Sequence, residues 1–65
     1  MTARDRLRQV FSRCVNDART EHESVARVAA ANAAMLADAI LNCSEDECQT
    51  RVELLLQSAP ELFPS

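Results

Sequence analysis

Glycine, tryptophan, tyrosine and lysine are all absent from this chain, and its two prolines, Pro60 and Pro64, stand within the last six residues. Without glycine, the chain lacks the residue that most readily adopts the backbone of tight β-hairpin turns and phosphate-binding loops. Glycine-rich nucleotide-binding motifs are therefore excluded. Alanine, arginine, glutamate and leucine dominate what remains, and all four are strong helix formers. The composition predicts an all-α protein.

The chain has 65 residues and a mass of 7.2 kDa, which is enough for one domain. A chain of this size buries only about 60% of the surface that its unfolded form exposes, so a lone copy is marginally stable and gains from a partner subunit. A hydrophobic core and a substrate-sized pocket do not both fit in so short a chain. We therefore expect a single helical domain over residues 1–65, with no enzymatic activity and no cofactor.

Charge is distributed unevenly along the chain, although the net charge is only −3. Residues 1–20 hold five arginines against two aspartates, whereas residues 21–65 hold two arginines against eight carboxylates. A nucleic-acid-binding protein is normally basic over a whole face, so nucleic acid is not the expected partner. Arginine pairs well with carboxylates, and a local cluster suits an acidic patch on another protein. We expect partner binding to involve Arg4, Arg6, Arg8 and Arg13.

The histidine and cysteine pattern gives no metal site. His22 is the only histidine, and the cysteines are Cys14, Cys43 and Cys48, so four ligands at zinc-binding spacings are not available. An odd number of cysteines without a signal peptide favours reduced thiols in a cytoplasm. The longest uncharged stretch, residues 28–37, is too short to span a membrane. We therefore expect a cytoplasmic protein with free thiols and no membrane contact.

Capping signals mark two helix starts. Thr2 precedes Asp5 by three residues, and Ser44 precedes Glu47 by three, which is the spacing of a capping box. In that motif the hydroxyl and the carboxyl side chains each accept a hydrogen bond from the other residue's backbone N–H. Helices are therefore predicted to begin directly after Thr2 and after Ser44.

The helix ends are less strongly marked. Neither proline nor glycine interrupts the chain before Asn42, which can end a helix. The pattern predicts one long helix over about 3–42 and a short helix over about 45–58 that Pro60 stops, followed by a tail at 59–65. A turn this short folds the second helix back antiparallel along the first, which makes a hairpin of unequal helices.

Apolar residues recur along the predicted long helix in steps of three or four, close to an eleven-residue repeat. The short helix can shield only about a third of this stripe, judged from the helix lengths. An uncovered apolar stripe marks a partner site, and a symmetric dimer with antiparallel long helices would cover it. The expected dimer interface comprises Leu7, Phe11, Cys14, Ala18, Val25, Ala29, Leu36 and Ile40.

The C-terminal tail offers two further apolar residues. Leu62 and Phe63 stand between the two prolines in a segment with no helix of its own. They either fold back onto the rest of the protein or serve as an exposed anchor for a partner. With the arginines, they complete the expected partner-binding residues.

In size and helix layout the chain resembles small phage-encoded inhibitors of host regulators, such as the anti-quorum-sensing protein that masks a LuxR-type transcription factor. The resemblance implies a small helical dimer that binds and blocks a host or cognate protein. In outline the chain is also similar to the Rop-type dimers of helical hairpins that bind paired RNA, and to the small co-chaperones of type III secretion. These two remain alternatives at the level of the sequence.

Overall fold

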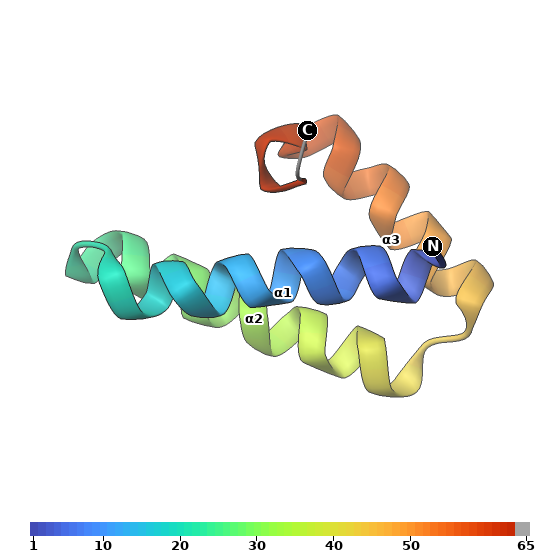
Figure 1. The fold of residues 1–65 in the computed structure, drawn as a ribbon, viewed down its shortest axis with the longest axis horizontal. Helices are drawn as coiled ribbons and strands as arrows, with labels where there is room; N and C mark the ends of the chain where they lie inside the picture. The colour runs from blue at the N-terminus through green and yellow to red at the C-terminus, as the bar shows by residue number, and fades with distance from the viewer. Residues whose placement is uncertain (64–65) are drawn as a thin grey trace.

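The computed structural model describes residues 1–63, and over these residues every regular element is helical. Three α-helices, α1 (Ala3–Thr20), α2 (Glu23–Asn42) and α3 (Glu45–Ser58), are followed by one short 3-10 turn, η1 (Pro60–Leu62) (Figure 1). The prediction of an all-α protein is confirmed. Pro64 and Ser65, the last two residues of the expected tail, lie outside the described residues.

Both predicted capping boxes are present. The Thr2 hydroxyl accepts from the Asp5 backbone N–H at 3.1 Å, and the Asp5 carboxylate accepts from the Thr2 N–H at 3.4 Å. At the start of α3, the Ser44 hydroxyl accepts from the Glu47 N–H at 3.2 Å, and the Glu47 carboxylate accepts in return at 2.9 Å. These side chains satisfy N–H groups that have no partner within the helix, which fixes where each helix begins.

The prediction of one continuous helix over 3–42 is wrong. The chain leaves the helical conformation at Glu21 (φ −94°, ψ 173°) and His22 (φ −60°, ψ 155°). The Glu21 N–H still donates to the Asp17 carbonyl at 3.0 Å, which closes α1, and the His22 carbonyl accepts from Ala26 at 2.7 Å, which opens α2. Two extended residues therefore reverse the chain, and α2 runs back antiparallel beside α1 (Figure 1).

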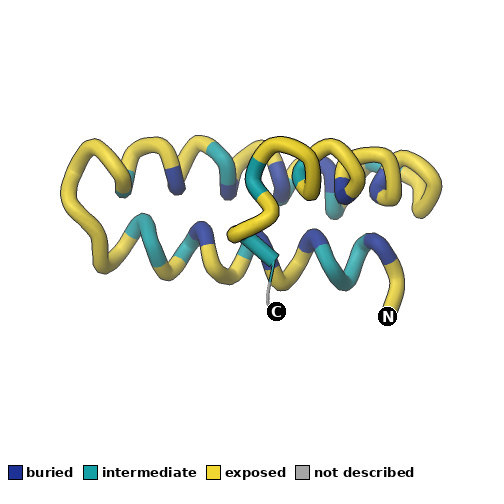
Figure 2. Tube along the Cα trace, turned by 90° about the horizontal axis from the view of Figure 1, so that it is seen from above, coloured by how far each residue is buried: buried dark blue, intermediate teal, exposed yellow. Residues whose placement is uncertain are grey.

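Burial explains why the helix breaks where no glycine or proline demands it. The connection falls in the polar run 19–24, where a continuous helix would bury nothing. Folding back lets each helix cover the apolar stripe of the other (Figure 2), with these residues buried: Leu7, Val10 and Cys14 of α1, and Ala29, Ala33, Leu36 and Ala39 of α2. Burying one leucine or valine side chain stabilises by about 1.5–3 kcal/mol, which outweighs the few helical hydrogen bonds lost at the break.

Helix α3 completes the core from one side. It packs mainly against α1, and its Cys48 and Val52 are fully buried. The Cys48 thiol donates to the Ala39 carbonyl at 3.8 Å, which ties the start of α3 to the end of α2. Beyond that point α3 diverges from the α1–α2 hairpin, as Figure 1 shows. The divergence leaves room between α2 and the C-terminal half of α3.

The break in the long helix also removes the reason for the expected dimer interface. Half of its residues are buried within one chain, namely Leu7, Cys14, Ala29 and Leu36. Phe11, Ala18 and Ile40 are half-buried, and Val25 is exposed. The stripe that was expected to need a second chain is covered largely by the hairpin itself. Leu7, Cys14 and Leu36 are therefore not available to a second chain in this fold.

Helix α2 is the most apolar segment of the fold. By length and composition alone, it is long and apolar enough to cross a membrane, with a mean hydropathy of 1.4 over a stretch of 18 residues. Only 22% of that stretch is buried in the fold. The sequence expectation considered the uncharged stretch 28–37 alone and missed this property. Helix α2 therefore keeps a large outward surface after packing against α1.

Candidate protein-binding surface

Arg4 was expected to bind a partner, but the structure gives it an internal role. Its guanidinium donates to the carbonyls of Ile40 and, at 2.5 Å, of Cys43, where α2 ends. The last carbonyls of a helix lack partners within it, and positive charge is favourable there. Arg4 therefore caps the C-terminus of α2 and is not free to contact another protein through these groups.

Two more arginines of the cluster hold the tail against α1. The Arg6 guanidinium lies 5.1 Å from the centroid of the Phe63 ring, within cation–π range. Arg13 donates to the Glu61 carbonyl at 2.8 Å. Leu62 and Phe63 are half-buried and pack against the core. Of the two alternatives for the tail, the structure has the folded-back one.

Arg8 is the fourth member of the cluster, and it pairs with Asp5 one turn away at 2.8 Å. Both side chains are about half exposed, so this pair contributes little to stability. The four arginines thus do not form the free basic patch that the sequence suggested. The sequence-based expectation missed this because each of the internal contacts of Arg4 and Arg13 spans more than 35 residues along the chain.

The cysteines and the histidine do not converge. Cys14 is buried, and burial raises the pKa of its thiol. Cys48 is buried beneath α3, Cys43 is half-buried in the turn after α2, and all three are free thiols. His22 is exposed at the N-cap of α2 and makes no capping bond through its side chain. Within residues 1–63, no group of three or more potential metal ligands comes together.

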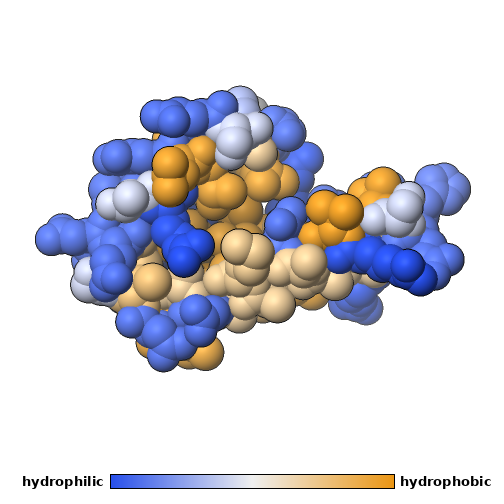
Figure 3. Space-filling view, turned by 180° about the vertical axis from the view of Figure 1, so that it is seen from behind, coloured by the Kyte–Doolittle hydropathy of each residue, from blue (hydrophilic) through white to orange (hydrophobic). Residues whose placement is uncertain are grey.

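The exposed apolar side chains lie mostly on α2 and α3. Val25, Val28 and Met35 of α2 are 49%, 62% and 61% exposed, and Leu54 of α3 is 59% exposed. Figure 3 shows this face of the molecule, where apolar residues form a band bordered by polar ones. Leu41 at the end of α2 is also exposed, but it adjoins a different hollow that Phe11 and Ile40 line. Exposed apolar patches of this kind mark interaction sites.

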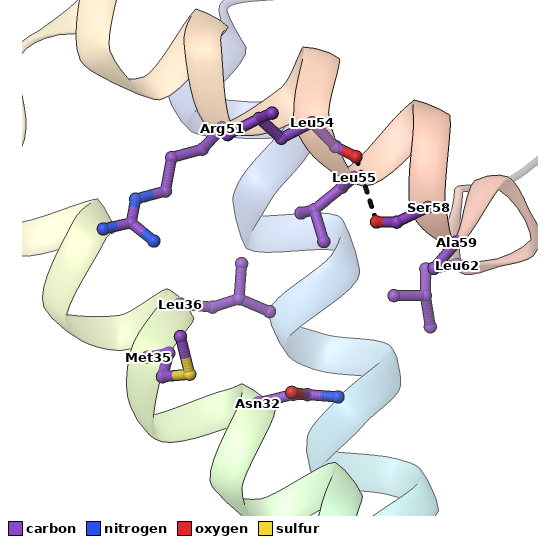
Figure 4. Close-up of a pocket in the computed structure, with 9 residues that line it drawn as sticks. All are labelled: Asn32, Met35, Leu36, Arg51, Leu54, Leu55, Ser58, Ala59 and Leu62. Carbon is purple, nitrogen blue, oxygen red and sulfur yellow. Dashed lines mark hydrogen bonds between the residues drawn. The ribbon is translucent and has the colours of Figure 1, made fainter.

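A groove opens within this band, between α2 and α3. Its volume is about 290 Å³, and its walls are Met35 and Leu36 of α2, Leu54 and Leu55 of α3, and Leu62 of η1 (Figure 4). The polar residues Asn32, Arg51 and Ser58 complete the lining. Ala59 also lines it, and we call the hollow that all these residues form the α2–α3 groove. It exists because α3 leans on α1 and leaves the α2 side of its own apolar face uncovered.

Arg51 gives the groove its charge. Its side chain extends from α3 toward α2 at the mouth of the groove (Figure 4). Within the described residues Arg51 makes neither an ion pair nor a side-chain hydrogen bond, although Glu47 precedes it by one turn. An unpaired guanidinium beside an apolar surface favours an occupant that brings a carboxylate.

No family model, curated protein or solved structure matches this chain.

One feature of the sequence indicated the groove, but its residues are not among the predicted binding residues. Leu54, Leu55 and Leu56 are consecutive, so they cannot all lie on one helix face. Leu55 turns half-buried toward the core, while Leu54 and Leu56 remain exposed. The surplus leucines on the short helix indicated a second apolar contact, but its location depended on how α3 crosses α1.

Proposed function

We propose that this protein is a non-enzymatic binding protein that docks an amphipathic helix of a protein partner in the α2–α3 groove. The observation that carries the proposal is the groove itself, an apolar trough between two helices with one unpaired arginine at its mouth. Laying the apolar face of a helix into such a trough is a common mode of peptide recognition. The short chain supports a surface of this kind better than it supports a reaction site.

The chemistry of the groove defines the occupant. Met35 and Leu54 offer flexible apolar contacts on opposite rims, and Leu36 forms part of the floor. The matching helix therefore presents leucine-like side chains at positions i and i+3 or i+4, with an aspartate or glutamate beside them for Arg51. An occupant without that carboxylate would leave the guanidinium partly desolvated and unpaired, at a cost in affinity.

A finer proposal is that binding of this protein blocks the activity of its partner, as in phage-type inhibitors of host transcriptional regulators. It rests on the resemblance in size, since three helices replace the long and short helix of the expected layout. A cytoplasmic location belongs to the same proposal. The Rop-like and co-chaperone alternatives find less support. Rop-type RNA binding would need a free basic face, whereas Arg4, Arg6 and Arg13 are engaged within the chain.

The test is affinity capture from lysate of the native host with the wild-type protein and four single variants. Leu54→Asp places a charge in the groove, and Arg51→Glu reverses the charge at its mouth. Leu41→Asp is the matched control for the leucine because Leu41 is also exposed but lies outside the groove. Arg19→Glu is the matched control for the arginine, since Arg19 is exposed at the end of α1.

We expect one protein to be captured by the wild type and both controls, in the presence of nuclease, and lost with both groove variants. A partner whose capture survives Leu54→Asp but not Leu41→Asp would move the binding surface to the hollow lined by Phe11, Ile40 and Leu41, and would contradict the proposal. Capture of nucleic acid alone, abolished by nuclease, would favour the RNA-binding alternative. Circular dichroism of each variant checks that the helices are intact.

A further inference from the structure

The outward face of α2 carries a pattern that the groove does not explain. Six exposed residues succeed one another along this face in steps of one or three, namely Arg27, Val28, Ala31, Ala34, Met35 and Asp38. All six turn away from α1, and only Met35 also lines the α2–α3 groove. We call these residues the outward face. Its centre is small and apolar, and its two ends carry opposite charges.

The spacing of the two charges is the decisive feature. Arg27 and Asp38 are eleven residues apart, which is three helical turns with an offset of about 20°, so both lie on one side of the face, about 16 Å apart. Arg27 pairs with Glu23 of its own helix at 2.7 Å, but both side chains are about four-fifths exposed, so that pair is weak and easily exchanged. Asp38 accepts only from Asn42 on its own helix.

A face of this kind is complementary to itself when two copies run antiparallel. In an antiparallel helix pair, the numbers of two residues that face each other add up to the same value along the whole pair. Setting Arg27 against the partner's Asp38 therefore also sets Ala31 against the partner's Ala34. Val28 then lies within one turn of the partner's Met35. The alanines at the centre let the two backbones approach closely, and a two-fold axis repeats the Arg27–Asp38 contact at the other end.

The opposite orientation is disfavoured by the same charges. A parallel pair would set Arg27 against the partner's Arg27, and Asp38 against the partner's Asp38, and like charges at such distances repel. We propose that the outward face of α2 binds a second copy of this chain antiparallel, with Arg27 of each copy paired with Asp38 of the other. This dimer surface replaces the one through Leu7 and Cys14 that the fold itself covers.

The proposal is independent of the groove, because neither Arg27 nor Asp38 lines it. One helix face makes a contact smaller than the roughly 1,200 Å² at which stable interfaces begin, so association belongs to the weak class. Sedimentation equilibrium from about 10 µM to about 1 mM covers the dissociation constants expected of weak interfaces. Wild-type protein should show a concentration-dependent approach to twice the chain mass.

Charge exchange between copies is the sharpest test. In a dimer of the Arg27→Asp variant, two aspartates meet at both contacts, and in a dimer of the Asp38→Arg variant, two arginines meet there. The dissociation constant of each variant alone should therefore be at least about tenfold higher than that of wild type. An equimolar mixture of the two variants restores both attractive pairs and should form heterodimers with an affinity within about threefold of wild type. The matched controls are Arg19→Asp and Glu53→Arg, two exposed charges outside the face, which should associate like wild type alone and mixed.

Four results would overturn the proposal. A wild-type chain that stays monomeric at about 1 mM has no such dimer, and a mixture of the two variants that stays monomeric refutes the Arg27–Asp38 register. Tighter association of Arg27→Asp with wild type than of wild type with itself would mean a parallel pair, because it sets the introduced aspartate against Arg27. Co-sedimentation of an otherwise monomeric protein with vesicles of phosphatidylcholine and phosphatidylglycerol would instead assign the apolar outward face to lipid. None of these results bears on capture through Leu54 and Arg51, so the two proposals fail separately.

Discussion

The backbone N–H of Arg4 donates to the Glu45 carboxylate at 3.3 Å, while the guanidinium of the same Arg4 donates to the last carbonyls of α2. Glu45 also accepts from the Ala3 N–H at 2.6 Å. One arginine thus caps the end of α2, and one glutamate of α3 caps the start of α1. The positive N-terminus of α1 and the negative C-terminus of α2 are both neutralised at this corner of the fold.

Removing this cap should be costly. Arg4→Met keeps the aliphatic stem but leaves the Ile40 and Cys43 carbonyls without their donors, so we expect the free energy of unfolding to fall by about 2 kcal/mol. Urea denaturation followed by circular dichroism measures it. Arg8→Met is the matched control, because the exposed Arg8–Asp5 pair contributes about 0–0.5 kcal/mol. Equal losses in the two variants would mean that the Arg4 contacts add nothing.

The capping box of α3 gives a second stability prediction. Ser44→Ala removes the hydroxyl that accepts from the Glu47 N–H, and we expect a loss of about 1 kcal/mol in the free energy of unfolding. Ser58→Ala is a suitable control, since its hydroxyl donates to the Leu54 carbonyl at the other end of the helix and caps no N–H. Denaturant melts of both variants would reveal whether α3 begins where the structure places it.

Acid should weaken the fold through the same motifs. Hydrogen bonds from Thr2 lower the pKa of Asp5 below its usual 3.8, and those from Ser44 lower the pKa of Glu47 below its usual 4.5. A carboxyl whose pKa is lower in the folded state stabilises the fold above its ordinary pKa, and that contribution is lost as the pH falls through the folded value. Thermal melts should therefore show a stability that is level from pH 7 to about pH 5 and declines below the ordinary values.

Replacing Glu47 isolates its share of this effect. In Glu47→Gln the acid-dependent contribution of that carboxyl is absent, so the melting temperature should fall less between about pH 5 and pH 3 than in wild type. Glu53→Gln serves as the control, because Glu53 is exposed on the same helix and takes no part in a cap. An identical acid dependence in wild type and Glu47→Gln would contradict the assignment.

The tail should behave as part of the fold. Phe63→Ala removes the ring beneath the Arg6 guanidinium and its packing on the core, so we expect a lower melting temperature with partner capture retained. Arg6→Met should lower it by a smaller amount, because the aromatic packing stays. An unchanged melting temperature together with lost capture would identify Phe63 as an exposed anchor instead.

The three thiols should differ in reactivity. Burial raises the pKa of the Cys14 thiol, and both Cys14 and Cys48 are nearly inaccessible, whereas Cys43 is half-buried. Thiolate content and access together control alkylation, so iodoacetamide should label Cys43 first in the native protein. Mass spectrometry of peptides after timed labelling would decide the order. Rapid labelling of Cys14 without denaturant would show that α1 and α2 separate readily.

The structure corrects the sequence-based expectation at specific residues, and the corrections share a cause. The sequence alone predicts a surface cluster of Arg4, Arg6 and Arg13, because their partners lie far away along the chain. These partners are the Ile40, Cys43 and Glu61 carbonyls and the Phe63 ring. The groove was missed for the same reason, since Met35 and Leu54 become neighbours only when α3 crosses the hairpin. Contacts between distant segments leave no periodic trace in the sequence.

The helical class, the two capping boxes and the ends of α2 and α3 can be predicted from the sequence, because they depend on residues within four positions of one another. Thr2 with Asp5, and Ser44 with Glu47, are visible at a fixed spacing, and the chain around Asn42 and Pro60 marks the stops. The reversal of the chain at Glu21 and His22, in contrast, depends on how the helices pack. No local residue forces that break, and the burial of Leu7 and Val10 against α2 selects it, which in turn decides which apolar side chains remain for other molecules.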